Sequence, residues 1–186
     1  MTTQILPLLT VDDLIGLPDD GSHYELIDGE LYVSRAPHIN HQLILLNIAQ
    51  SIKNYLDQNP IGRIVPEAGV IFDKHNAAIP DLTFMTNETY AEIVSGGKIH
   101  AAPDLAIEII SYGAEQEARD RSLKLRLYGQ RGVREYWIVD SRAKTIEIYH
   151  RTSQGLSLAS TLGEADILTT SFLPDFQLQI TKVFDV

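Results

Sequence analysis

Apolar and polar residues follow two periods along this chain, and each period predicts one kind of element. Apolar positions recur at helical spacing over 38–59, where an Asn-Pro pair ends the run, and again over 115–130, just before Gly132. Short apolar runs between turn residues predict strands instead. The predicted strands cover 63–72, 81–85, 104–110, 135–139 and 144–150, with edge strands over 156–161 and 176–180. Many strands with long helices between them are typical of an α/β or α+β domain with a mixed central sheet flanked by helices.

Two shorter motifs lie near the N-terminus. Thr10 and Asp13 have the spacing of a capping box, which predicts a short helix to about residue 17. An Asp-Gly pair at 28–29 separates two extended runs and predicts a two-residue hairpin. In the register of that hairpin, Glu25 lies directly across from Tyr32.

Size and composition predict one soluble domain. The chain has 186 residues, of which 44% are hydrophobic and 22% charged, so we expect a single domain over 1–186. No apolar run approaches the ~18 residues of a membrane span, and we expect a cytoplasmic protein. The chain has no cysteine, which excludes disulfides, iron–sulfur clusters and cysteine nucleophiles. The net charge of −10 argues against nucleic-acid binding by charge alone.

Two acidic residues interrupt apolar strands and are candidate metal ligands. Glu108 lies inside a run that is apolar on both faces, which is typical of a strand in the middle of a sheet. A glutamate is rarely buried there unless it is paired or binds a metal, although an edge strand would let it face water. Asp81 opens another short apolar strand. Two neighbouring strands could thus present two carboxylates to a hard cation such as Mg²⁺.

Four further residues admit both a functional and a purely structural interpretation. Lys124 and Asp120 fall within the expected packed face of the second long helix, but they could equally form a surface pair four residues apart. Glu25 could face solvent from its hairpin. His41, near the start of the first long helix, could line a site or be an ordinary surface residue.

The order of these residues resembles the PD-(D/E)XK nuclease superfamily. More closely, the chain is similar to a large bacterial family of putative restriction endonucleases that was formerly a domain of unknown function. The matching stretches are Tyr24-Glu25-Leu26-Ile27-Asp28-Gly29-Glu30-Leu31, His41-Gln42, Pro80-Asp81, Ala106-Ile107-Glu108-Ile109-Ile110-Ser111, and the run from Asp120 to Tyr128 that leads into 132–140. These short stretches extend from about residue 24 to residue 140, a span that includes most of the chain.

The resemblance implies a restriction-endonuclease-like fold, with a nuclease core over about 22–150, and Mg²⁺-dependent hydrolysis of DNA. Asp81, Glu108 and the main-chain carbonyl of Ile109 would bind Mg²⁺ or Mn²⁺. Lys124 would supply the catalytic lysine from the helix, because Ile110 stands where the strand motif has lysine. Glu25 would also be catalytic and bind metal through water. Asp120 would position Lys124, and His41 would line the site.

Two departures from the family pattern keep a second interpretation open. The strand lacks its lysine, and the usual Ser-Pro-Ser that follows it is Ser111-Tyr112-Gly113 here. A catalytically inactive nuclease-fold module that binds partners is therefore the main alternative, and a phosphohydrolase for smaller substrates is another.

Partners and variants can also be anticipated. Six basic residues between 119 and 134 predict a basic ridge for weak or structure-directed DNA contact. The family resemblance and an apolar stretch over 168–180 lead us to expect a homodimer. Lys124→Ala is expected to leave folding nearly intact and to lower cleavage about a hundredfold or more.

Overall fold

The computed structural model describes residues 8–110 and 119–186, and the side chains of all of these except 119 and 120. A six-stranded mixed sheet lies at its centre, in the spatial order β12-β11-β10-β9-β6-β3. Its strands are β3 (Gly62–Pro66), β6 (Leu82–Thr86), β9 (Leu105–Ile109), β10 (Glu135–Asp140), β11 (Thr145–Thr152) and β12 (Gly155–Leu162). Only β9 and β10 run parallel among these neighbours. The predicted α/β class with a mixed central sheet is confirmed.

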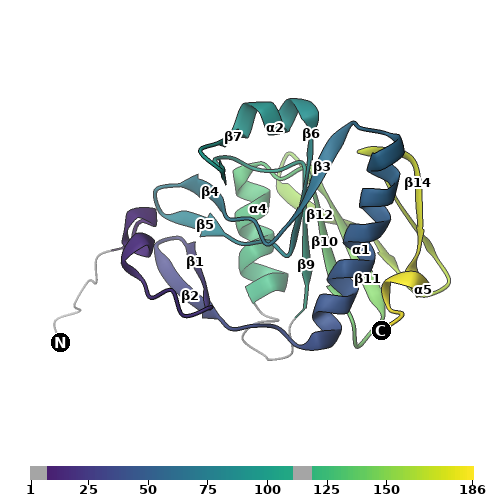
Figure 1. Ribbon diagram of the computed structural model, residues 1–186, viewed down its shortest axis with the longest axis horizontal. Helices are drawn as coiled ribbons and strands as arrows, with labels where there is room; N and C mark the ends of the chain where they lie inside the picture. The colour runs from purple at the N-terminus through teal and green to yellow at the C-terminus, as the bar shows by residue number, and fades with distance from the viewer. Residues whose placement is uncertain (1–7, 111–118) are drawn as a thin grey trace.

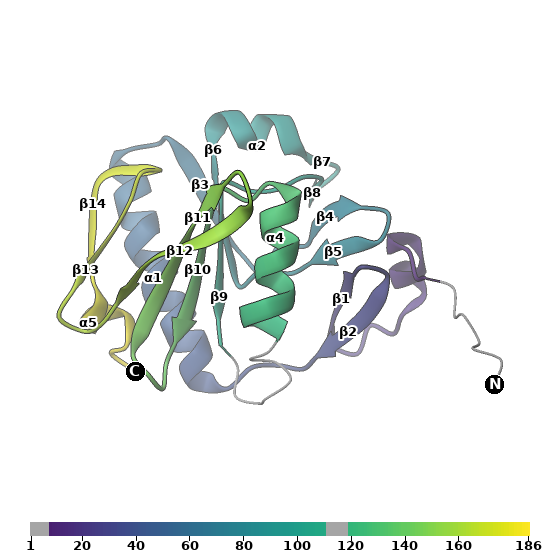
Figure 2. The same ribbon diagram turned by 180° about the vertical axis from the view of Figure 1, so that it is seen from behind.

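Helices cover both faces of this sheet. Figures 1 and 2 show α1 (Ile39–Gln58) on one side and α4 (Leu125–Arg131) on the other. The side of α1 also carries the C-terminal elements, which are β13 (Ile167–Thr170), β14 (Leu173–Gln179) and α5 (Ile180–Val183). Buried residues of α1, such as Ile44 and Ile48, share one apolar core with Leu168, Phe176 and Ile180. The central sheet is therefore buried on both faces.

A second, smaller sheet lies beside α4, in the order β2-β1-β5-β4-β8-β7. Its strands are β1 (His23–Ile27), β2 (Glu30–Ser34), β4 (Val70–Asp73), β5 (Asn76–Ala78), β7 (Val94–Ser95) and β8 (Lys98–Ile99). A 3-10 helix, η1 (Val11–Gly16), and a short helix, α2 (Asn87–Ile93), accompany it. The hairpin prediction is confirmed: Asp28 and Gly29 have φ of 52° and 79°, and Glu25 pairs with Tyr32.

Three predictions need correction. The expected strand over 63–72 is two strands in different sheets, because the chain turns after Pro66 through Glu67, whose φ is 46°. The described part of the helix expected over 115–130 begins as a π-helix, η2 (Arg119–Lys124), and continues as α4. The apolar residues over 168–180 pack against α1 of the same chain, so they do not support a dimer.

Among the described residues, no helix has the length and apolar character needed to cross a membrane.

Candidate active site

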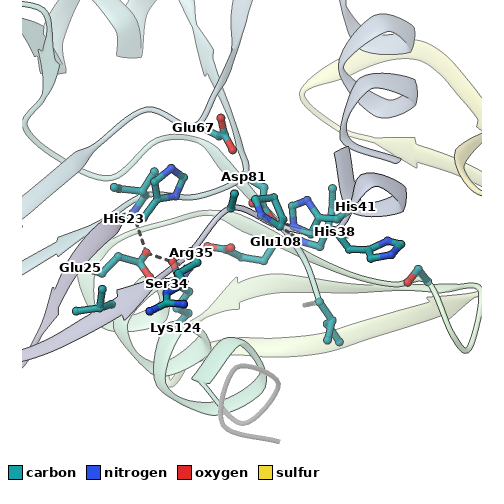
Figure 3. A pocket seen from close by; sticks show the side chains of 17 residues that line it. His23, Glu25, Ser34, Arg35, His38, His41, Glu67, Asp81, Glu108 and Lys124 are labelled. Atoms are coloured by element: carbon teal, nitrogen blue, oxygen red, sulfur yellow. Dashed lines mark hydrogen bonds and ion pairs between the residues drawn. The ribbon is translucent and has the colours of Figure 1, made fainter. Parts of the chain in front are cut away.

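A pocket of about 520 Å³ opens at the end of the central sheet where β6 begins and β9 ends. These two strands are antiparallel neighbours, with Leu82 paired to Ile107. One step further along this register sets Asp81 against Glu108, and both residues line the pocket (Figure 3). The two acids thus lie on adjacent strands and share one cavity, as the apolar strands around them predicted.

Asp81 is held by the two elements on either side of it. Its Oδ2 accepts the main-chain N–H of Ile109 at 2.6 Å and lies 3.1 Å from Nε2 of His41. His41 is 7% exposed and lies in the first turn of α1. Burial alone would lower the pKa of His41, but the hydrogen bond and negative charge of Asp81 outweigh it and raise the pKa above 6.5. The imidazole beside this carboxylate therefore binds a proton more readily than a free histidine does.

Glu108 is buried in the middle of the sheet. Its strand lies between β10 and β6, so the alternative of an edge strand that faces water is wrong. Its Oε1 accepts hydrogen bonds from Nζ of Lys124 at 2.9 Å and from the hydroxyl of Tyr128 at 2.6 Å. Burial, with the charge of Glu108 and of Glu25, raises the pKa of Tyr128 well above 10.0. The phenol thus remains a donor to Glu108.

Lys124 joins the two sheets through a buried ionic contact. Its side chain is 3% exposed, and its Nζ lies 3.0 Å from Oε1 of Glu25 as well as 2.9 Å from Glu108. The same oxygen of Glu25 accepts the main-chain N–H of Ile79 at 2.8 Å. Glu25 is itself buried, so the interpretation in which it faces solvent is wrong. Removing Lys124 would leave two buried carboxylates without their shared cation, which overturns the expectation that its loss is nearly harmless to folding.

The segment that carries Lys124 has an uncommon conformation. Lys124 is the last residue of the π-helix η2 and directly precedes α4. Single π-turns inside helices are frequent at functional sites, because the extra residue redirects side chains. The side chain of Asp120, the Ser111-Tyr112-Gly113 stretch and the residues 115–118 all lie outside the described residues.

The predicted basic ridge does not form as a row of unpaired cations. Acidic residues from other parts of the chain contact these arginines, in the pairs Arg121–Asp140, Arg121–Glu147, Arg126–Asp28, Arg131–Asp73 and Arg134–Asp104. The sequence could not show this, because most of the acids are distant along the chain. These arginines thus form no row of unpaired cations, and DNA contact at this surface stays a prediction.

The pocket also brings together residues that the sequence did not single out. His23, Ser34, Arg35, His38 and Glu67 line it (Figure 3). Arg35 and His38 lie in the link between β2 and α1. That link joins the hairpin of Glu25 to the helix of His41. Its polar residues could therefore have been predicted to line the site from their position between two candidate residues.

The donor set suits a hard cation that the substrate helps to bind. No three acidic or histidine side chains among the described residues lie close enough together for a complete metal site. The pocket nevertheless offers the carboxylates of Asp81 and Glu108 beside the main chain of Ile109. Mg²⁺ in proteins commonly has one or two carboxylate ligands, with waters and substrate phosphates completing its shell. These residues therefore fit Mg²⁺ or Mn²⁺.

Comparisons with known proteins bear on the family and the fold of this chain. The sequence model of the Uma2 family, described as "Putative restriction endonuclease", matches residues 11–181. Among solved structures, a putative nuclease belonging to DUF820 from Anabaena variabilis ATCC 29413 is 20% identical, with a TM-score of 0.76 over 95% of this chain and 97% of that chain. At that identity the similarity shows a shared fold alone. No curated protein matches the chain.

Proposed function

Because the chain belongs to the Uma2 family of putative restriction endonucleases, we propose that it is a metal-dependent endonuclease that hydrolyses phosphodiester bonds in DNA. The family match supports a nuclease-like function. The observation that carries the finer proposal is the meeting of Asp81, Glu108 and Lys124 in one pocket at the end of the central sheet. Carboxylates can hold Mg²⁺, which activates water and polarises a phosphate, and a lysine can stabilise the charge that develops on the phosphate.

Asp81 and Glu108 would hold Mg²⁺ or Mn²⁺, with the main-chain carbonyl of Ile109 as a further ligand. When bound, the cation would polarise the scissile phosphate and lower the pKa of a bound water. His41 holds the carboxylate of Asp81 from α1, while the N–H of Ile109 fixes the same oxygen from β9. Tyr128 fixes the carboxylate of Glu108. The two ligands are thus oriented before any substrate arrives.

Lys124 would act on the phosphate itself. Its ammonium lies between Glu25 and Glu108 and lines the pocket, so it can approach the oxygens of a bound phosphodiester. There it would orient the attacking water or stabilise the negative charge that develops on the phosphate oxygens. Glu25 would keep the ammonium in place and contact the cation through water. Asp120 is proposed to position Lys124 from within the same helical segment.

Calorimetric titration of the full chain with Mn²⁺ tests the ligand assignment. We expect carboxylate-dependent binding that is lost in Asp81→Asn and in Glu108→Gln. Asp57→Asn is the matched control, because Asp57 is an exposed acid on α1 whose ion pair within the described part of the chain is with Lys53. Hydrolysis of labelled DNA with Mg²⁺ should likewise be lost in Asp81→Asn and in Glu108→Gln and be retained in Asp57→Asn. Equal Mn²⁺ binding by all four proteins would contradict the assignment.

An inactive interaction module remains the second candidate, for one specific reason. The buried contacts among Glu25, Glu108 and Lys124 already balance charge and could serve the fold alone. Such a module would show no carboxylate-dependent metal binding in the same titration.

A homodimer and a cytoplasmic location are also proposed, on the family resemblance and the composition. Light scattering at tens of micromolar protein should give twice the monomer mass of 20.8 kDa. A monomer mass under those conditions would contradict the dimer.

A further inference from the structure

The charges around the pocket bear on the form of nucleic acid that it can bind. Four of the arginines near α4 contact acids from other elements, namely Arg121, Arg126, Arg131 and Arg134. An arginine that already contacts a carboxylate must lose that contact, or share it, before it binds a phosphate. The described surface of α4 therefore offers little charge to a DNA backbone.

Arg35 differs from these residues. It is exposed, it lines the pocket, and within the described part of the chain no acid forms an ion pair with it. Among the described side chains, Lys124 is the other lysine or arginine of the pocket lining, and it is already held by Glu25 and Glu108. Figure 3 shows Arg35 near the end of β2, with Ser34 beside it and His23 on the neighbouring strand. Arg35 therefore offers a cation to a phosphate at this edge of the pocket.

Duplex binding needs more charge than this. Each phosphate of a duplex that a Lys or Arg neutralises releases condensed counterions, so duplex affinity grows with the number of such contacts. Here the net charge is −10, so most of the surface repels a duplex. The cavity of about 520 Å³ has the size of a small-ligand pocket, which suits one or two nucleotides. A base of a paired strand can enter such a cavity only after it leaves the duplex, at a cost of a few kcal/mol.

We propose that the pocket takes an unpaired DNA strand, with Arg35 binding a phosphate next to the one placed at Asp81 and Glu108. The inference rests on the proposed nuclease function and specifies its substrate class. An unpaired strand needs few contacts, because it is flexible enough to bring one phosphate to the acids and a neighbouring one to Arg35. Single-stranded stretches and frayed strand ends both meet this requirement.

Fluorescence anisotropy with the full chain tests this substrate class. The probes are a labelled single-stranded oligonucleotide and the duplex of the same sequence, with Ca²⁺ in place of Mg²⁺ to prevent cleavage. We expect the single strand to bind at least about tenfold more tightly. Its log affinity should fall with log salt at a slope of about −0.7 to −1.4, the value for one or two phosphate contacts.

Arg35→Ala should weaken single-strand binding about five- to tenfold and reduce the slope by about 0.7, because one phosphate contact is lost. Lys182→Ala is the control: it removes the same charge from an exposed position on α5, away from the pocket lining, and should change neither value. Equal or tighter duplex binding, a slope steeper than about −3, no binding of either probe, or an Arg35→Ala variant that binds like the parent would overturn the inference.

The outcome can be separated from that of the nuclease proposal. Metal-dependent cleavage confined to duplex DNA would overturn the substrate class and leave the nuclease proposal standing. Arg35-dependent binding of single strands without any hydrolysis in Mg²⁺ or Mn²⁺ would overturn the nuclease proposal and leave the single-strand binding standing.

Discussion

Replacing Lys124 by alanine should destabilise the fold strongly, as well as reduce hydrolysis. The ammonium lies 3.0 Å from Glu25 and 2.9 Å from Glu108, and all three side chains are at most 4% exposed. Removing one member of a buried ion pair costs about 3–5 kcal/mol, because the remaining charge stays buried without its partner. For a chain of this size, each kcal/mol lowers the Tm by about 2–4 °C. We therefore expect the Tm of Lys124→Ala to fall by about 6–20 °C.

Thermal unfolding followed by circular dichroism, with EDTA present, measures this change. Lys124→Met separates charge from volume, because methionine restores most of the side chain but not the ammonium. Charge is the dominant factor in this reasoning, so the methionine variant should melt nearly as low as the alanine variant. Lys144→Ala is the control, since Lys144 forms a half-exposed pair with Glu164 that contributes at most about 1 kcal/mol.

Metal provides a second measurement on the same variants. Mg²⁺ would bring positive charge back to the carboxylates, so it should raise the Tm of Lys124→Ala more than that of the parent. Cleavage, measured below the unfolding range, should fall by about a hundredfold or more. A Tm for Lys124→Ala within about 2 °C of the parent, or full recovery in Lys124→Met, would refute the argument from buried charge.

Three more predictions follow from other described residues. Asp81→Asn should abolish Mg²⁺-dependent hydrolysis while the protein still folds, which activity and circular dichroism together would show; retained hydrolysis would contradict the ligand role. Burial raises the pKa of Glu135 above 4.5, so its carboxyl group binds a proton more tightly in the folded chain than in the unfolded chain. The stability that this protonation contributes is present below about pH 4.5 and is lost as the pH rises through the folded pKa. Glu135→Gln should therefore gain stability relative to the parent between pH 4 and pH 7 in urea unfolding, and a constant difference would count against it. Gly62→Ala should cost about 1–3 kcal/mol, because a Cβ there would lie 2.5 Å from the carbonyl oxygen of Met85, whereas Gly16→Ala meets open space and should cost less than about 1 kcal/mol.

Local signals in the sequence predicted much of the fold. The Asp-Gly turn specified the hairpin of Glu25, because that pair readily adopts the positive φ that both turn residues have here. The run around Glu108 indicated a central strand because it is apolar on both faces, and an acid inside such a strand needs a partner. Both signals depend on residues that are neighbours in the chain.

The features that the sequence missed depend on contacts between distant segments. Apart from the predicted hairpin of β1 and β2, the small sheet has strands of two to four residues, too short for a clear period in the sequence. The partners of Arg126 and Arg131, Asp28 and Asp73, come from this sheet, so the helix looked like a basic ridge when considered alone. The burial of Lys124 likewise became visible only once the hairpin and β9 were placed on either side of it.

The ionic contact that joins the two sheets also restricts how this chain can change over generations. Glu25 belongs to the small sheet, Glu108 to the central one, and Lys124 connects them, so altering any one of the three leaves buried charge behind. Replacing all three by apolar residues could be neutral or even stabilising, but every single step toward that state passes through a less stable protein. A lineage that no longer needed cleavage would therefore tend to retain these residues. Their presence in a relative is consequently weaker evidence of activity than the presence of Asp81, whose carboxylate is partly open to the pocket.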